Sequence, residues 1–291
     1  MIGIFSAFGA SLSWTYACFI WRRNSYKFKP TQLNLIKNLV AFLVFIPALI
    51  NINFYENIEY IFILFISGIV GIGLGDTFYI KSLKKIGTRR TLSIESISPI
   101  IAAFSGQVFI KERLSISSWI GILIVSLSLI RLLCRKNTFL KTDKELSNFQ
   151  VVPIDYLYSF LSVFCAVIAA ALSRLVFLKT DLNPFQTTEI RLLGAIIFLM
   201  LITKLKTNFL FYKLDNQEKI NLFLSIIFGT NIGIFLQQLV FKTLPLGIGW
   251  TLLSTSPLIS LFFVVEEEGE IPLEIIFSTL ILCFGIGMTI I

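Results

Sequence analysis

The stretch Gly71-Ile-Gly-Leu-Gly-Asp-Thr-Phe-Tyr-Ile80 (GIGLGDTFYI) decides how this sequence is interpreted. It sets three glycines beside one carboxylate, Asp76, and it follows the apolar run YIFILFISGIV at 60–70. Asp76 is therefore a neighbour of a phosphate loop, a catalytic acid, or a polar residue inside a membrane. The rest of the chain has to separate these three alternatives.

Composition favours the membrane. The chain has 291 residues, of which 56% are apolar and 14% charged, and its mean hydropathy is +0.84. About a quarter of the residues in soluble proteins are charged. Histidine, the commonest metal ligand and catalytic base, does not occur. The four cysteines lie far apart without CxxC spacing, so neither a zinc site nor a disulfide framework is indicated. We expect no metal and no cofactor.

Apolar runs long enough to cross a membrane follow one another along the whole chain. A spanning helix needs about 20 such residues. The longest polar connection, 135–155, leaves five runs on each side. The sequence thus predicts an all-α polytopic membrane protein with ten transmembrane helices. The ten runs are 2–21, 31–50, 59–80, 90–110, 117–134, 156–178, 185–203, 219–241, 246–266 and 272–291.

The two halves of the chain repeat one another. A shift of 154 residues pairs PTQLNLIKNLVA (30–41) with PFQTTEIRLLGA (184–195), so that Lys37 meets Arg191. A shift of 158 residues, without a gap, aligns identical residues from Gly71 to Glu112. We expect a first five-helix repeat at 1–134, a polar linker at 135–155 and a second repeat at 156–291. The identical pairs are Gly71/Gly229, Gly75/Gly233, Lys84/Lys242, Ser96/Ser254, Ser98/Ser256, Pro99/Pro257, Ile101/Ile259, Phe104/Phe262 and Glu112/Glu270.

An odd number of helices in each repeat has a topological consequence. The second copy must enter the membrane from the opposite side, and inverted repeats of this kind are typical of secondary transporters. Loops 1, 3, 5 and 7 carry 18 Lys and Arg residues, against four on the other side. The positive-inside rule places these loops in the cytoplasm and both termini outside. Because the basic residues form short clusters between apolar runs, the net charge of +8 does not indicate a nucleic-acid partner.

Charged and amide side chains inside the spans are candidates for a substrate site or a gate. A charge at a helix centre costs about 2.5–3.5 kcal/mol on insertion scales, so it is usually paired or faces water. Asp76 or Glu95 is a candidate to take a coupling proton. The alternatives are snorkelling of the basic side chains, structural ion pairs, and amides that only join helices. The predicted clusters are Lys37, Asp76 and Glu95 on the loop-1 side, and Arg174, Glu189, Arg191, Gln237 and Gln238 on the opposite side, with Asn34, Asn38 and Asn231 as further amides.

Two prolines interrupt spans at matching positions of the repeats. Pro99 ends the sequence SISP (96–99) and Pro257 ends STSP (254–257). Proline breaks a helix locally, and paired interruptions point to a binding site. We expect Ser96, Pro99, Ser254 and Pro257 to line a cavity or to mark a structural kink. The aromatic residues Trp14, Tyr16, Tyr79 and Trp250 are candidates to stack on a substrate, or they serve packing alone.

The glycines around Asp76 do not form a nucleotide loop. A dinucleotide fingerprint needs a strand before it and a helix after it, whereas Gly71, Gly73 and Gly75 lie within one apolar span. Gly71 and Gly75 instead allow another helix to approach closely. The sequence GLGD (73–76) resembles the G-x-G-D motif of intramembrane aspartyl proteases. That chemistry needs two carboxylates, and the other aspartates lie outside the spans, so no enzyme is expected.

Two long segments, 73–124 and 229–270, resemble the EamA type of the drug/metabolite transporter superfamily. Each has a glycine-rich third helix, a short basic turn and a fourth helix with the S-x-x-P pattern. KERLS (111–115) matches the family's GE-R turn except for Lys111, and GEIPL (269–273) matches it in part. LQQLVFK (236–242) resembles the family's eighth helix.

The resemblance implies ten helices around a central cavity, with both termini in the cytoplasm, which differs from the charge count. It also implies export or exchange of small metabolites, often amino acids, without ATP. Protons or a counter-substrate would provide the coupling. We therefore predict a secondary transporter in the cell membrane, plasma or inner, working as a monomer or homodimer by alternating access. The alternative is a membrane scaffold or receptor-like protein that transports nothing.

Overall fold

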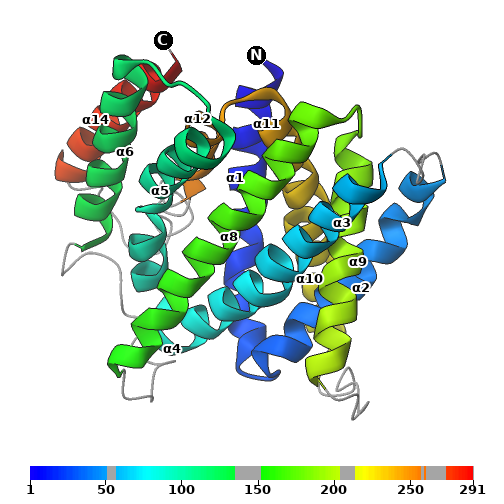
Figure 1. Ribbon diagram of the computed structural model, residues 1–291. Coiled ribbons are helices and arrows are strands. Elements are labelled where there is room, and N and C mark those ends of the chain that lie inside the picture. The colour runs from blue at the N-terminus through cyan, green and yellow to red at the C-terminus, as the bar shows by residue number, and fades with distance from the viewer. Residues whose placement is uncertain (51–56, 135–151, 204–213, 257–258, 260–272, 291) are drawn as a thin grey trace.

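The computed structural model describes residues 1–50, 57–134, 152–203, 214–256, 259 and 273–290. These residues fold into helices, and no strand occurs among them. The helices pack side by side in one bundle, with both termini at one end and the turn between α1 and α2 at the other (Figure 1). The expected all-α class is confirmed for this part of the chain.

Six of the described helical stretches are long and apolar enough to cross a membrane. Shorter apolar helices lie in three of the other four expected spans, and the fourth, 246–266, extends beyond the described residues. The six are α1 (Ile2–Ser25), α2 (Pro30–Phe45) with η1 (Ile46–Leu49), α3 (Ile58–Ser67) with η2 (Gly68–Gly75) and the start of α4 (Asp76–Glu95), α8 (Pro153–Lys179), α9 (Pro184–Thr203), and α10 (Asn216–Ser225) with η5 (Ile226–Ile232) and α11 (Gly233–Thr243). The shorter elements are α5 (Ser98–Ser105) with η3 (Gly106–Ile110), α6 (Ile116–Cys134), α12 (Leu246–Leu253) and α14 (Leu273–Ile290).

Interruptions of the helices recur at the spacing of the sequence repeat. The π-helical segment η2 begins at Gly68 and its counterpart η5 begins at Ile226, which is 158 residues later. The helices α4 and α12 end at Glu95 and Leu253, again 158 residues apart. Gly87, with a φ of 82°, kinks α4 at the position that corresponds to Pro245, directly before α12. On this correspondence we propose that the two halves are inverted repeats.

Backbones of the two halves touch directly at small residues. A Cβ atom on Gly68 would overlap the carbonyl of Arg191, and one on Gly194 would overlap the carbonyl of Phe65, so α3 and η2 lie against α9 without intervening side chains. Gly71 and Gly75 both face α8: a Cβ there would lie 2.5 Å from Ala169 Cβ and 3.2 Å from Cys165 Cβ, respectively. The predicted close approach at these two glycines is confirmed.

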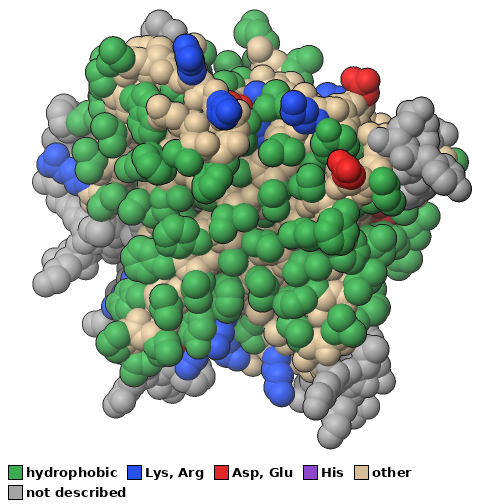
Figure 2. Space-filling view, in the orientation of Figure 1, with side chains coloured by type: hydrophobic (Ala, Val, Ile, Leu, Met, Phe, Trp, Pro, Cys, Tyr) green, Lys and Arg blue, Asp and Glu red, His purple; other side chains and the backbone are tan. Residues whose placement is uncertain are grey.

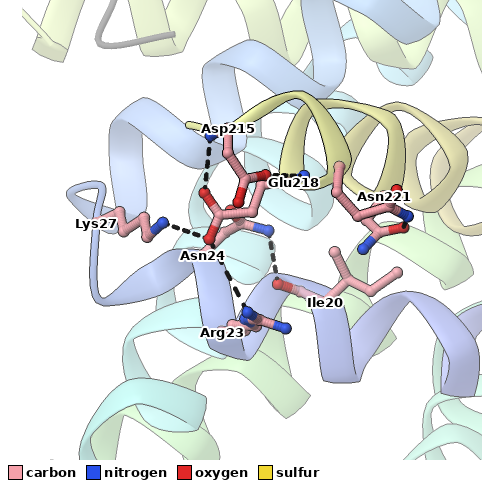
Figure 3. A network of polar contacts seen from close by, with 8 residues as sticks. Ile20, Arg23, Asn24, Lys27, Asp215, Glu218 and Asn221 are labelled. Carbon is pink, nitrogen blue, oxygen red and sulfur yellow. Dashed lines mark hydrogen bonds and ion pairs between the residues drawn. The ribbon is translucent and has the colours of Figure 1, made fainter. Parts of the chain in front are cut away.

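Ion pairs lie at both ends of the bundle. Hydrophobic side chains cover the middle of the face in Figure 2, and most Lys and Arg side chains gather towards its two ends. At the loop-1 end, Glu218 pairs with Lys27 and lies 4.0 Å from Arg23 (Figure 3). Asp215 caps α10 by accepting a hydrogen bond from the Glu218 amide at 2.6 Å. Loop 1 is thereby joined to the start of α10.

At the opposite end of the bundle, Glu112 in the turn before α6 joins this turn to α8 and α12. Arg174 Nε of α8 donates to the Glu112 carboxylate at 2.7 Å, and the Leu246 amide at the start of α12 donates to its other oxygen at 2.7 Å. Arg174 Nη1 also donates to the carbonyls of Phe241 and Lys242 at 2.9 and 3.0 Å. Arg174 is therefore an ion-paired residue of this end, rather than a member of a central polar cluster.

We predict that Gly68→Ala strongly destabilises the protein, whereas Gly287→Ala does not. The added Cβ at Gly68 would meet backbone atoms that cannot move aside, while nothing lies within 4 Å of a Cβ at Gly287. Overpacking costs about 1–3 kcal/mol, and alanine favours a helix over glycine by about 1 kcal/mol. Thermal unfolding of the two variants in detergent measures the difference. Equal midpoints would contradict the close approach of η2 and α9.

Candidate functional site

A cavity of about 130 Å³ lies between the helices of the two halves. Its walls come from α1, η2, α4 and α5 of the first half, and from α8, α9, α11 and α12 of the second half. Trp14 and Trp250 contribute aromatic surface on the two sides. The cavity thus brings together segments that are far apart in the sequence.

The repeat spacing is visible in the wall of this cavity. Residues 158 positions apart line it together, which places the cavity where corresponding parts of the two halves meet. Secondary transporters with repeats hold their substrate in such a place. The pairs that line the cavity are Gly75/Gly233, Asp76/Ile234, Tyr79/Gln237, Glu95/Leu253, Ser96/Ser254 and Ser98/Ser256.

The serines of SISP and STSP make the same hydrogen bonds in both halves. Ser96 and Ser254 donate to the carbonyls four residues earlier, at 3.0 and 2.9 Å. Ser98 and Ser256 donate to the carbonyls three residues earlier, at 2.6 and 3.3 Å. A hydroxyl that donates to the backbone still accepts with its oxygen. These serines therefore stabilise the helix interruption and also offer acceptor atoms to the cavity.

The charges of the cavity wall are not symmetric. The first half places two carboxylates there, Asp76 and Glu95. The corresponding residues of the second half are apolar, Ile234 and Leu253. The second half contributes one cation instead, Arg191 on α9. The wall therefore presents acids from one repeat and a guanidinium from the other.

Lys37 is the counter-ion of Asp76. Its side chain is fully buried, its Nζ pairs with the Asp76 carboxylate, and it lies 4.8 Å from the centre of the Trp21 ring. A buried ammonium is tolerated only when it is paired. Lys37 does not line the cavity and does not reach the surface, so snorkelling does not describe it. Asp76 thus has a lysine as its partner, and no second aspartate of the described residues lines the cavity.

Two asparagines form hydrogen bonds between helices, which is the structural role that the sequence offered as an alternative to substrate binding for the amide side chains. Asn34 Nδ2 donates to the carbonyls of Ile72 and Gly73 in η2 at 2.7 and 3.1 Å, and lies 2.9 Å from Thr77 Oγ1. Asn231 Nδ2 donates to the carbonyl of Ala41 at 2.9 Å. Asn34 thereby joins α2 to the π-helical segment η2.

Arg191 has a different environment from Lys37. Only 3% of the residue is exposed, and its Nε and Nη1 atoms have no hydrogen-bond partner within the described residues. Its Nη2 atom lies beside Gly71, where a Cβ would be 3.2 Å away. Arg191 and Gln237, predicted for the second cluster, line the same cavity as Asp76 and Glu95 of the first.

The remaining candidates divide into three groups. Trp14, Ser96 and Ser254 line the cavity. Pro257 lies outside the described residues. Four candidates are buried but do not line the cavity, and the side-chain oxygens of Glu189 and both polar atoms of Gln238 have no partner among the described residues. These four are Glu189, Gln238, Asn231 and Pro99.

Sequence reasoning identified Trp14 on α1 but missed Ser11 and Thr15 on the same helix. Ser11 lines the cavity and donates to the carbonyl of Leu253 at 2.8 Å, and Thr15 donates to the carbonyl of Ser256 at 3.1 Å. Both hydroxyls hold the chain where α12 ends. The spacing of four residues between two small polar side chains on an apolar helix was the available signal, because it places both on one face.

A bundle of apolar helices around a cavity with buried charges is the architecture of a multi-pass membrane protein. Residues 1–134 match the model of the EamA-like transporter family, which confirms the predicted resemblance to EamA-type drug/metabolite transporters. A solved structure titled only "Crystal structure of protein" shares the fold over 98% of this chain and 95% of its own, with a TM-score of 0.72 and 16% identity. No curated protein matches the sequence.

We predict that Asp76→Asn lowers the stability of the protein by about 3–5 kcal/mol, because it leaves the buried Lys37 without its counter-ion. The double variant Lys37→Met/Asp76→Asn removes the charge as well and should recover much of the loss. Thermal unfolding in detergent at constant pH compares the three proteins. A single variant that is as stable as the wild type would contradict the pairing.

Proposed function

We propose that the protein is a secondary active transporter, an exporter or exchanger, of small polar metabolites such as amino acids. It works by alternating access in the plasma or inner membrane, without ATP hydrolysis and without catalysis. The observation that supports this most directly is the cavity that repeat-related residues of both halves line together. In transporters with inverted repeats, such a site stays fixed while the halves rock around it.

The contacts at the two ends of the bundle support the same proposal. An ion pair between Glu218 and Lys27 joins segments at the loop-1 end of the bundle. An ion pair between Glu112 and Arg174 does the same at the other end. Alternating access requires each end to open while the other stays closed. Ion pairs at positions of partial exposure suit this role, because water replaces part of the lost interaction when the pair separates.

The size and chemistry of the cavity favour a small solute. Drug-sized ligands occupy about 300–1,000 Å³, and the cavity here has about 130 Å³. Its wall combines serine hydroxyls, the Gln237 amide and charged groups with two tryptophans. Glu95 lines the cavity, and its carboxylate has no hydrogen bond or ion pair within the described residues. This makes Glu95 a better candidate for a coupling proton than Asp76, which is paired with Lys37. A counter-substrate is the other candidate for the coupling.

Transport in proteoliposomes tests the proposal. We would measure uptake and efflux of a mixed pool of amino acids and related metabolites, with and without a pH gradient. We expect Ser254→Trp to reduce transport at least tenfold, because the indole fills the cavity. Leu127→Trp on the exposed face of α6 is the control and should transport like the wild type.

Two outcomes contradict the proposal. Equal rates in wild-type and empty vesicles for every solute of the pool would favour a membrane scaffold or receptor-like protein. Equal transport by the Ser254→Trp and Leu127→Trp variants, both folded, would show that solutes do not pass through this cavity.

A further inference from the structure

Lys37 and Arg191 occupy equivalent positions in the two halves, but among the described residues only Lys37 has an acidic partner. The pairing of 30–41 with 184–195 aligns the two cations. Their helices also have equivalent neighbours, since α2 packs against α4 and α9 packs against α11. Asp76 at the start of α4 pairs with Lys37. At the corresponding position of α11, the second half has Ile234.

Among the described residues, Arg191 is consequently a buried cation without an ion-paired acid. Its Nε and Nη1 atoms have no hydrogen-bond partner in the described part of the chain, and the residue is only 3% exposed. Asp76 interacts electrostatically with Arg191, but the Asp76 carboxylate is already paired with Lys37. A buried charge left unpaired is strongly destabilising. An anion that enters the cavity would complete this site.

The guanidinium lies at the cavity wall, where its Nε and Nη1 atoms are buried. Arg191 forms part of the cavity wall, and Gly71 beside its Nη2 atom has no side chain that would cover it. Ile234 lines the same cavity and offers no hydrogen-bonding group. A planar guanidinium binds a carboxylate through two parallel hydrogen bonds. Lys37 is unsuited to this task because it is fully buried and paired.

We propose that Arg191 is the anion-binding residue of the cavity, that its ligand is a small metabolite with a carboxylate group, and that Ile234 keeps the guanidinium available by replacing the acid of the first half. The proposal rests on the proposed function only in taking this cavity as the substrate site. It makes Ile234 a specificity-determining position, although its side chain has no charge.

Binding of matched carboxylates and amides to the purified protein tests this inference. The probes are L-leucine with L-leucinamide, L-phenylalanine with L-phenylalaninamide, and propionate with propionamide. Trp14 and Trp250 line the cavity, so tryptophan fluorescence reports occupancy directly, and thermal stabilisation gives a second readout. We expect the wild type to bind at least one carboxylate tenfold or more tightly than its amide, and Arg191→Gln to lose this preference.

A second pair of variants leaves Arg191 in place, which keeps the test valid if Arg191→Gln does not fold. Ile234→Asp gives Arg191 the partner that Lys37 has in the first half, so it should abolish the carboxylate preference. Ile234→Asn adds a polar group of the same size without the charge and should retain most of the preference. We also expect Ile234→Asp to unfold at a higher temperature than Ile234→Asn.

Three results would overturn the inference: no carboxylate preference in the wild type, an undiminished preference in folded Arg191→Gln, or identical preferences in the two Ile234 variants. These results are distinct from failure of the transport proposal. Arg191-dependent binding without any transport would refute the transporter and leave the anion site. Transport that ignores the carboxylate would refute the anion site alone.

Discussion

Inside a membrane every backbone polar group needs a partner within the protein, and the interrupted helices of this chain depend on that constraint. Where η2 departs from α-helical geometry, the Asn34 amide takes up two of its carbonyls. Where α12 ends, hydroxyls of Ser11 and Thr15 on α1 do the same. The interruptions are therefore stabilised by side chains of neighbouring helices, and both of them border the cavity.

The repeat provides the framework, and departures from the repeat provide the chemistry. Serine hydroxyls at both interruptions bond the same carbonyls in each half. The charged residues do not follow the repeat, because Asp76 and Glu95 of the first half correspond to the apolar Ile234 and Leu253 of the second. A cavity built by two similar halves thus has a wall with acids from one repeat and a cation from the other.

The sequence was sufficient for the features that follow from periodicity and spacing. Apolar run length predicted an all-helical membrane protein, and the matched SISP and STSP segments pointed to residues that line the cavity, Ser96 and Ser254. It could not separate Glu189, which is buried away from the cavity, from Arg191, two residues later, which lines it. That difference depends on which neighbouring helix each side chain meets, and a single sequence does not record it.

The two equivalent cations have different surroundings, and on our proposal they serve two purposes. Lys37 has an aspartate partner, so its charge is satisfied and it stabilises the packing of α2 on α4. Arg191 has an isoleucine in that place, so its charge remains available to the cavity. Differential affinity for a ligand is what shifts a conformational equilibrium. An unpaired buried cation supplies such a difference, since it gains an interaction only when an anion is bound, whereas a paired cation gains nothing.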